Sequence, residues 1–334
     1  MDLVTFEDVQ RAAARLQGVA HRTPVLTSTQ LDRISGAHVS LKCENFQRVG
    51  AFKFRGAYNA VATRLEQGPV SRAITLSSGN HAQGLALACR LHGLTAHIVM
   101  HHPINDLKRR AVDQYGAVIH EAQTRAEAET LVRRLSEELP ATPVHAFNDP
   151  AVIAGQGTAA LELLETVPDL DAILAPIGGG GLLSGASLAA HALRPTLQLF
   201  ACEPTGALDA MQSIRENRIV PMPAPHTIAD GLRTSVGDVT LPILRRHLES
   251  VFPVEEPEIV AAMRFAFERL KIVIEPSSAV ALAPLLRGEP ALQGRRVGVI
   301  VTGGNVDLSD YCDGIMGQGG QAETRNPTGA VPPR

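Results

Sequence analysis

A single lysine lies between two phenylalanines in the stretch Gly50-Ala51-Phe52-Lys53-Phe54-Arg55-Gly56. If this stretch is extended, Phe52 and Phe54 point to one side and Lys53 points to the other. An amine held against apolar neighbours loses hydration, which lowers its pKa and favours the neutral form. A neutral amine can attack a carbonyl group and form a Schiff base. The sequence therefore offers Lys53 as a nucleophile; the alternative is a lysine that only extends its charged end into solvent.

Four consecutive glycines follow an apolar run in Pro176-Ile177-Gly178-Gly179-Gly180-Gly181-Leu182 and open a predicted helix. Glycines let backbone N–H groups converge, and a helix N-terminus adds partial positive charge. The run therefore predicts an anion site, most often for phosphate, with a flexible turn as the alternative. It is neither a dinucleotide fingerprint nor a nucleotide P-loop, because GxGxxG with a downstream acid and a following Lys-Ser/Thr are both missing.

Two polar segments lie where predicted strands end. Ser77-Ser78-Gly79-Asn80-His81-Ala82-Gln83-Gly84 opens a helix, and Val301-Thr302-Gly303-Gly304-Asn305 closes the last predicted strand. In open α/β sheets, ligands bind in the crevice at the carboxyl ends of the strands. The first segment offers hydroxyls and N–H groups for a carboxylate, although a well-capped helix has the same residues. The hydroxyl and glycines of the second segment suit a ring that approaches the backbone.

Two carboxylates flank a turn in Glu203-Pro204-Thr205-Gly206-Ala207-Leu208-Asp209. Hard divalent cations prefer carboxylate oxygens together with backbone carbonyls. The spacing alone is compatible with two interpretations, a metal site and a pair of solvated acids.

The elements that carry these residues alternate between strand and helix. A helix is predicted at 5–17 with Thr5 as its N-cap, a strand at 38–43 and a helix at 56–65. Further strands are predicted at 73–76, 96–100, 117–120, 172–177, 198–203 and 297–302, and further helices at 81–92, 105–115, 125–139, 154–166, 182–193 and 257–270. This alternation implies parallel strands joined by right-handed crossovers. Residues 204–240 are predicted to be loops around a site.

The composition narrows the class of protein. A chain of 334 residues suggests two domains, and a net charge of -3 argues against nucleic acid or an anionic membrane as the main partner. No apolar run is long enough to span a bilayer, and the N-terminus has no signal-peptide pattern. The four cysteines are widely scattered, which is typical of free thiols in a reducing cytoplasm.

Taken together, GAFKFRG, SSGNHAQG, the glycine run and VTGGN resemble the fold-type-II pyridoxal phosphate enzymes. Within them the chain is similar to the branch of serine/threonine dehydratases, serine racemases and hydroxyaspartate dehydratases, from about residue 5 to residue 312 with the motifs in family order. The resemblance implies a two-domain α/β fold like that of tryptophan synthase β, each domain a mostly parallel sheet flanked by helices. Residues 1–70 and 150–316 would form a large cofactor domain, 71–149 a small mobile domain and 317–334 a disordered tail.

The resemblance also assigns roles around the cofactor. Lys53 would hold pyridoxal phosphate covalently and act as the base on one face, and Phe52 would pack near the ring. Asn80 would donate to the phenolic oxygen, and Gly178, Gly179, Gly180 and Gly181 would bind the phosphate. Thr302 would face the pyridine nitrogen with a hydroxyl, which leaves the ring a mild electron sink suited to elimination.

Substrate contacts are implied for Ser77, Ser78, Asn80, His81, Arg125 and Ser235. Ser78 would be a second catalytic residue on the face opposite Lys53, because bases on two faces permit racemisation whereas one suffices for elimination. A helix cap is the alternative for Ser78. The spacing around Arg125 departs from the racemase pattern, so an ordinary surface residue is the alternative there.

A metal is implied at Glu203, the Ala207 carbonyl and Asp209, with Mg²⁺ expected and Ca²⁺ or Mn²⁺ as alternatives. The expected activity is that of an ammonia-lyase converting an L-β-hydroxy amino acid (3-hydroxyaspartate, serine or threonine) to a 2-keto acid and ammonia. A serine racemase is the nearest alternative, a β-replacement synthase is another, and a non-catalytic cofactor-binding protein is the most distant. The family resemblance implies a homodimer, and the scattered cysteines predict a cytoplasmic location.

Overall fold

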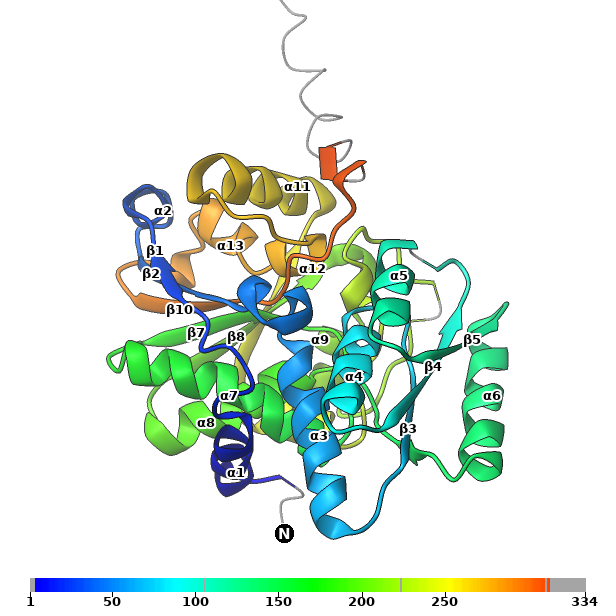
Figure 1. Cartoon of the computed structure of the whole chain (residues 1–334). Helices are drawn as coiled ribbons and strands as arrows, with labels where there is room; N and C mark the ends of the chain where they lie inside the picture. The colour runs from blue at the N-terminus through cyan, green and yellow to red at the C-terminus, as the bar shows by residue number, and fades with distance from the viewer. Residues whose placement is uncertain (1–3, 105, 223, 310, 313–334) are drawn as a thin grey trace, which may run out of the picture.

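The computed structural model describes residues 4–104, 106–222, 224–309 and 311–312, which form two β-sheets (Figure 1). The smaller sheet has the order β5 (Val118–Ala122), β4 (Thr95–His101), β3 (Arg72–Leu76) and β6 (Thr142–Pro143), all parallel. The larger sheet has the order β1 (Val25–Thr27), β2 (His38–Cys43), β10 (Arg296–Val301), β7 (Ala172–Pro176), β8 (Gln198–Pro204) and β9 (Leu248–Val254). Its neighbours are parallel except β1 and β2, so the predicted α/β class is confirmed.

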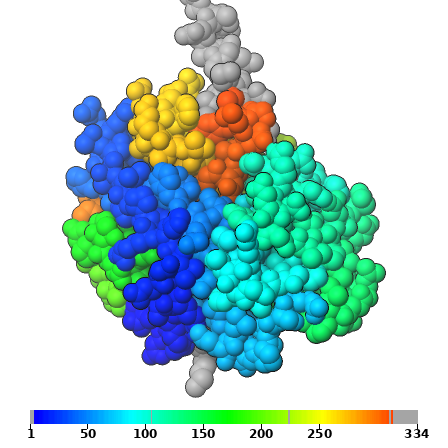
Figure 2. Space-filling view, in the orientation of Figure 1, coloured from blue at the N-terminus to red at the C-terminus, as the bar shows by residue number. Residues whose placement is uncertain are grey.

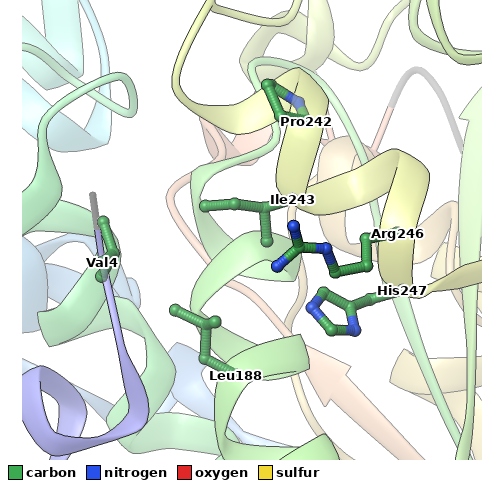
Figure 3. Close-up of a pocket in the computed structure, with 6 residues that line it drawn as sticks. All are labelled: Val4, Leu188, Pro242, Ile243, Arg246 and His247. Atoms are coloured by element: carbon green, nitrogen blue, oxygen red, sulfur yellow. The ribbon is translucent and has the colours of Figure 1, made fainter. Parts of the chain in front are cut away.

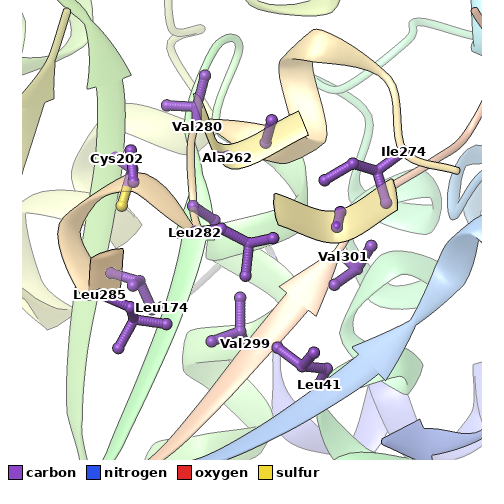
Figure 4. Close-up of a cluster of buried hydrophobic side chains, with 14 of the residues drawn as sticks. Leu41, Leu174, Cys202, Ala262, Ile274, Val280, Leu282, Leu285, Val299 and Val301 are labelled. Atoms are coloured by element: carbon purple, nitrogen blue, oxygen red, sulfur yellow. The ribbon is translucent and has the colours of Figure 1, made fainter. Parts of the chain in front are cut away.

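Helices cover both faces of the larger sheet. One face packs against α1 (Phe6–Leu16), α7 (Pro150–Thr166), α8 (Gly181–Leu193) and α10 (Thr240–His247). The other packs against α2 (Thr29–Ser35), α11 (Glu256–Phe265), α12 (Pro276–Ala279) and α13 (Ala283–Leu286). Because side chains alternate along a strand, Ile173 joins the first apolar cluster and Leu174 joins the second. In the second cluster, Leu174 and Val299 of the sheet lie near Leu282 and Leu285 (Figure 4).

The smaller sheet is also buried on both faces. Ile98 and Met100 of β4 pack with α3 (Lys53–Gln67), α4 (Asn80–Leu91) and α5 (Asp106–Gln114), whereas Val99 packs with α6 (Arg125–Glu138). Figure 2 shows the cyan and green residues of this part gathered on one side of the molecule. The division into a large domain of 1–70 and 150–316 and a small mobile domain of 71–149 stays a prediction, because the arrangement of strands does not measure motion.

Most predicted elements are confirmed to within a few residues. The Thr5 cap of α1 is present: the Asp8 N–H donates to the Thr5 hydroxyl at 3.4 Å, and the Thr5 N–H donates to the Asp8 carboxylate at 2.9 Å. The range 257–270, predicted to be a helix, is helical throughout, but the α-helix α11 ends at Phe265 and the last five residues, Ala266–Leu270, form a π-helical turn. The predicted loop segment 204–240 holds a further helix, α9 (Asp209–Glu216). Strands β1 and β9 and helices α2 and α10 were not predicted, because their apolar patterns are short.

Among the described residues, no helix is long and apolar enough to cross a membrane. All four cysteines are free thiols, and only Cys312 is exposed. The tail predicted to be disordered, 317–334, lies outside the described residues.

Candidate active site

Lys53 is the first residue of α3, so the stretch around it is not extended, which corrects the sequence prediction. Phe52 has helical φ and ψ of -54° and -24°. The Phe52 N–H donates to the carbonyl oxygen of Thr302, just past β10, at 2.9 Å, and this bond fixes the helix start against the larger sheet. Helix α3 also approaches α7 closely, since a Cβ built on Gly56 would lie 2.8 Å from the carbonyl oxygen of Val152. A side chain at this position would therefore push Lys53 away from its place.

A buried ionic cluster holds the same end of α3. Arg55 donates to both carboxylate oxygens of Glu44, at 2.7 and 2.8 Å, and to both of Glu162, at 2.7 and 2.8 Å. Lys42 donates to Glu162 at 2.6 Å. Burial alone would raise the pKa of Glu44, but the charges of Arg55 and Lys42 outweigh it and the pKa is lowered. The cluster connects β2, α3 and α7 next to Lys53, and it was not predicted because its members lie far apart in the chain.

The amine of Lys53 is half-buried and donates to the carbonyl oxygen of Ala146 at 2.9 Å. It lies 5.1 Å from the centroid of the Phe52 ring, whereas the packing of Phe52 near the cofactor ring stays a prediction. Burial lowers the pKa of Lys53 to about 8, and the nearby Glu275 carboxylate opposes this shift. The direction is the one that the sequence predicted, and about a tenth of the amine is neutral at pH 7, far more than for an unperturbed lysine.

The glycine run joins β7 to α8, as predicted. Gly180 has a φ of +85°, which favours glycine, and a Cβ on Gly179 would lie 2.3 Å from the ring of Phe147. The Thr240 hydroxyl donates to the Gly179 carbonyl oxygen at 2.8 Å and fixes the loop. The first N–H groups of a helix have no partners within it, so the loop can accept an anion. Gly178–Gly181 therefore fit the phosphate of the expected cofactor.

Asn80, the first residue of α4, lies against the loop that follows β10. Its amide nitrogen donates to the two carboxylate oxygens of Glu275, at 2.8 and 3.0 Å. The amide nitrogen of Asn305 donates to the Asn80 side-chain oxygen at 2.9 Å. Burial raises the pKa of Glu275 to about 7. Asn80, Lys53 and Thr302 thus come from distant parts of the chain to one region, as the proposed cofactor roles require.

The side chains of Ser77, Ser78 and His81 in the SSGNHAQG segment contact backbone atoms. The Ser78 hydroxyl accepts the His101 N–H at 3.3 Å, and the Ser77 hydroxyl accepts an N–H at 3.3 Å from the residue two positions later. The ring nitrogen Nε2 of His81 lies 3.3 Å from the carbonyl oxygen of Val144. Burial, reinforced by Lys53, lowers the pKa of His81 to about 3, so the ring is neutral with its proton on Nε2. Its Nδ1 is then a buried acceptor without a hydrogen-bond partner among the described residues.

Three further predicted residues lie in different surroundings. Arg125 begins α6, is largely exposed and pairs with Glu129 at 3.1 Å. The hydroxyl of Ser235 bonds to the carboxyl of Asp209, which places it beside the predicted metal ligands. Thr302 is buried. The substrate roles of Arg125 and Ser235, and the ring-nitrogen role of Thr302, stay predictions.

The predicted metal ligands lie together at the start of α9. The Glu203 carboxylate accepts the N–H groups of Ala210 and Met211 at 2.7 and 2.8 Å, and the Asp209 oxygen Oδ2 is buried without a partner among the described residues. Burial raises the pKa of Glu203 to about 8 and that of Asp209 to about 6. Buried acids with raised pKa values and an unpaired oxygen suit a cation that also takes the Ala207 carbonyl and water. No group of three His, Cys, Asp or Glu side chains in the described residues is arranged to hold a metal.

The loop between β6 and α7 contributes residues that sequence reasoning missed. Nδ1 of His145 accepts the N–H groups of Phe147 and Asn148, at 3.3 and 3.0 Å, so the neutral ring carries its proton on Nε2. Burial lowers the pKa of His145, and the charge of Lys53 adds to this shift. In this loop, the carbonyl oxygen of Ala146 accepts a hydrogen bond from Lys53, and the ring of the next residue, Phe147, packs against the glycine run. A histidine in an irregular loop carries no sequence signal for such a position.

A small pocket lies elsewhere, between the N-terminal segment, α8 and α10 (Figure 3). Its lining residues are Val4, Leu188, Pro242, Ile243, Arg246 and His247. None of them belongs to the predicted site.

Comparison with known proteins gives consistent results. A family model described as pyridoxal-phosphate dependent enzyme matches residues 16–303. An L-threo-3-hydroxyaspartate ammonia-lyase from Pseudomonas sp is 44% identical over 319 residues, covering 95% of this chain and 100% of the relative. A serine racemase from Arabidopsis thaliana is 42% identical over 311 residues, covering 91% of this chain and 94% of the relative.

Solved structures agree with this relationship. The structure of maize serine racemase superposes with a TM-score of 0.89 at 40% identity, covering 94% of this chain and 98% of the maize chain. The predicted resemblance and the predicted enzyme class are therefore confirmed. This chain belongs to the pyridoxal-phosphate dependent enzymes, in the branch that includes hydroxyaspartate ammonia-lyases and serine racemases.

Proposed function

We propose that this chain is an ammonia-lyase that uses pyridoxal phosphate to convert an L-β-hydroxy amino acid, with 3-hydroxyaspartate favoured over serine and threonine, to a 2-keto acid and ammonia. The observation that carries the proposal is the Lys53 amine: its pKa is lowered to about 8, and it lies beside the loop that reaches the glycine run. The 44% identity to a hydroxyaspartate ammonia-lyase supports the choice of reaction.

The chain's own groups divide the work of this reaction. Gly178–Gly181 bind the phosphate, and Asn80 donates an N–H toward the ring. When bound, pyridoxal phosphate supplies an electron sink for the electrons released at the substrate Cα. Nζ of Lys53 takes the Cα proton, and it can do so because burial favours its neutral form. The β-hydroxyl leaves as water, so that elimination removes one water molecule from Cα and Cβ. Hydrolysis of the resulting product then uses one water molecule and gives the 2-keto acid and ammonia.

A dicarboxylate substrate needs a partner for its second carboxylate, because a buried unpaired charge is costly. His81 and Arg125 are the candidates from the sequence, but the free nitrogen of His81 is an acceptor, which suits a substrate ammonium or hydroxyl instead. His145 has a protonated Nε2, and the charge of Arg125 is near enough to contribute to its lowered pKa. We therefore assign the second carboxylate to His145 and Arg125.

The test is 2-keto acid release by the purified protein with pyridoxal phosphate and Mg²⁺, on stereodefined 3-hydroxyaspartates, L-serine and L-threonine. We expect the highest kcat/KM on an L-3-hydroxyaspartate and no release by the Lys53→Ala variant. Arg125→Met should reduce kcat/KM for the dicarboxylate far more than for serine. Release that does not depend on Lys53, or no release from any substrate, would contradict the proposal.

Serine racemase remains the second candidate, because serine racemases are among the relatives at 42% identity. Ser78 is the proposed acid/base on the second face, and its hydroxyl accepts the His101 N–H. We expect Ser78→Ala to abolish D-serine formation and to spare much of the elimination. Equal loss of both activities would count against a two-face mechanism.

Three further parts of the proposal concern the metal, the oligomeric state and the location in the cell. Mg²⁺ at Glu203, Ala207 and Asp209 is supported by the unpaired oxygen of Asp209, and calorimetry with Mg²⁺, Ca²⁺ and Mn²⁺ would rank the cations. A homodimer is expected from the family, and light scattering measures the mass in solution. A cytoplasmic location is in line with four free cysteines, and fractionation of the source cells tests it.

A further inference from the structure

Glu275 is a buried carboxylate to which neither the motifs nor the proposed reaction gives a role. It is 3% exposed, and its carboxylate accepts hydrogen bonds from the side-chain nitrogen of Asn80 at 2.8 and 3.0 Å and from the backbone N–H of Asn305. A Cβ on Gly303 would lie 2.7 Å from one of its oxygens, so glycine lets the carboxylate reach this place. Burying a carboxylate costs free energy unless its charge is compensated. The presence of a buried carboxylate beside Asn80 therefore calls for a reason beyond packing.

The Glu275 carboxylate is the last acceptor in a chain of hydrogen bonds through the side-chain amides of Asn305 and Asn80. The side-chain nitrogen of Asn305 donates to the carbonyl oxygen of Val49 at 2.7 Å and to the side-chain oxygen of Asn80 at 2.9 Å. The Asn80 nitrogen then donates to Glu275. A backbone carbonyl and an ionised carboxylate can only accept hydrogen bonds. With Glu275 ionised, both ends of the chain are acceptors, so neither amide can turn over without leaving a buried group unpaired. With Glu275 protonated, the Val49 carbonyl still accepts only, so it fixes the Asn305 amide and through it the Asn80 amide.

This arrangement fixes which way the Asn80 amide faces. One N–H of Asn80 is used by Glu275 and the side-chain oxygen by Asn305. The second N–H is left for an acceptor outside the chain of amides. A ligand oxygen that needs a donor would therefore meet an N–H of Asn80 and never its oxygen.

A lysine from the smaller sheet's side helps to keep Glu275 ionised. Lys108 of α5 is 5% exposed and forms an ion pair with Asp230 in the loop before α10. Burial raises the pKa of Glu275, and the charge of Lys108 is the largest influence that lowers it, whereas Asp230 raises it. Lys53 on α3 is the second cation that interacts with Glu275. The charge of Glu275 partly opposes the lowering of the Lys53 pKa by burial. Two cations thus surround the carboxylate.

We propose that Glu275 is a positioning residue for the cofactor site: together with Asn305 it fixes the orientation of the Asn80 amide, so that an N–H and not an oxygen faces the phenolic oxygen of pyridoxal phosphate. The inference rests on the proposed function for the identity of that ligand. Glu275 acts through Asn80 and takes no part in the chemical steps.

The test measures pyridoxal phosphate affinity and the absorption spectrum of the bound cofactor, with no substrate present. Removing the acceptor in Glu275→Met should weaken binding at least about tenfold, as expected for a hydrogen bond to a charged group, and shift the absorption maximum. Asn80→Ala should do the same. The double variant should lose no more than Asn80→Ala alone, because Glu275 acts only through Asn80. Glu275→Gln, which keeps an acceptor, should recover most of the affinity.

Two outcomes would overturn the inference: wild-type affinity and spectrum in Glu275→Met, or a double variant whose losses multiply. If Glu275→Met does not fold, Asn305→Leu tests the other end of the chain by the same double-variant comparison. Failure of the proposed function looks different. It would be a wild-type protein that binds pyridoxal phosphate normally and releases no 2-keto acid, and the Glu275 comparison would still decide the inference.

Discussion

Replacing Arg55 with methionine should destabilise the protein by about 3–5 kcal/mol, the loss typical of a buried ion pair that loses one partner. The guanidinium is completely buried and donates to all four oxygens of Glu44 and Glu162 at 2.7 to 2.8 Å. Methionine roughly keeps the volume but satisfies none of these oxygens. Glu162 keeps the ammonium of Lys42 at 2.6 Å, so the loss falls mainly on Glu44.

The assay is equilibrium unfolding in urea, followed by circular dichroism on the cofactor-free protein at pH 7.5. Arg296→Met is the matched control, because Arg296 also bonds to two carboxylates, those of Asp169 and Asp171, but on the surface. Exposed pairs contribute far less, so its loss should be much smaller. If the two variants lose similar free energy, the stranded-charge reasoning is wrong.

A second comparison isolates the stranded charge itself. Adding Glu44→Gln to Arg55→Met removes the unpaired carboxylate, so the double variant should be more stable than Arg55→Met alone. In Arg55→Met, burial raises the pKa of Glu44 above its value in the unfolded chain. The folded form then binds the extra proton, and the variant should recover stability as the pH falls from 7.5 to 5.5. No recovery by either route would refute the reasoning.

The remaining predictions concern the ligand sites. Because burial lowers the pKa of Lys53 to about 8, cofactor-free protein should react with an aromatic aldehyde at a rate whose pH midpoint is near 8, and a midpoint above 10 would contradict this. Burial raises the pKa of Glu203 to about 8 and of Asp209 to about 6, so without metal the folded form holds protons that the unfolded chain has released above about pH 4. The free energy of unfolding should therefore fall as the pH rises toward 8 in EDTA, and Mg²⁺ should reverse the fall; identical profiles would argue against a cation site. A Cβ on Gly179 would lie 2.3 Å from a phenylalanine ring, so Gly179→Ala should weaken pyridoxal phosphate binding at least tenfold in an absorbance titration, while Gly68→Ala, with open space around it, should not.

The strand-to-helix junctions were predictable because their signals are local. An apolar run followed by glycines marks the end of β7 and the start of α8, and the polar segment after β3 marks the start of α4. The placement of Asn80 and the glycine run at the carboxyl ends of parallel strands follows from the βαβ alternation. These parts of the site needed no knowledge of distant contacts.

The contacts around Lys53 were not predictable, because each joins residues far apart in the chain. Asn80 and Glu275 are 195 positions apart, and Lys53 and Ala146 are 93 apart. The Phe-Lys-Phe alternation suggested an extended segment, yet the carbonyl of Thr302 accepts the Phe52 N–H and starts a helix there. Tertiary packing overrode the local pattern at this point.

The direction of the pKa shifts separates the buried Arg55–Glu44 ion pair from three groups of the ligand sites, Lys53, Glu203 and Asp209. Burial lowers the pKa of Lys53 and raises those of Glu203 and Asp209, so each group moves toward its neutral form. Arg55 and Glu44 are just as buried, but each stabilises the charge of the other, and their pKa values move apart toward the charged forms. The paired guanidinium and carboxylate therefore stay charged, whereas the charges near Lys53, Glu203 and Asp209 do not outweigh the burial of these groups. A carbonyl compound would be the partner of the amine, and a divalent cation would be the partner of the two acids.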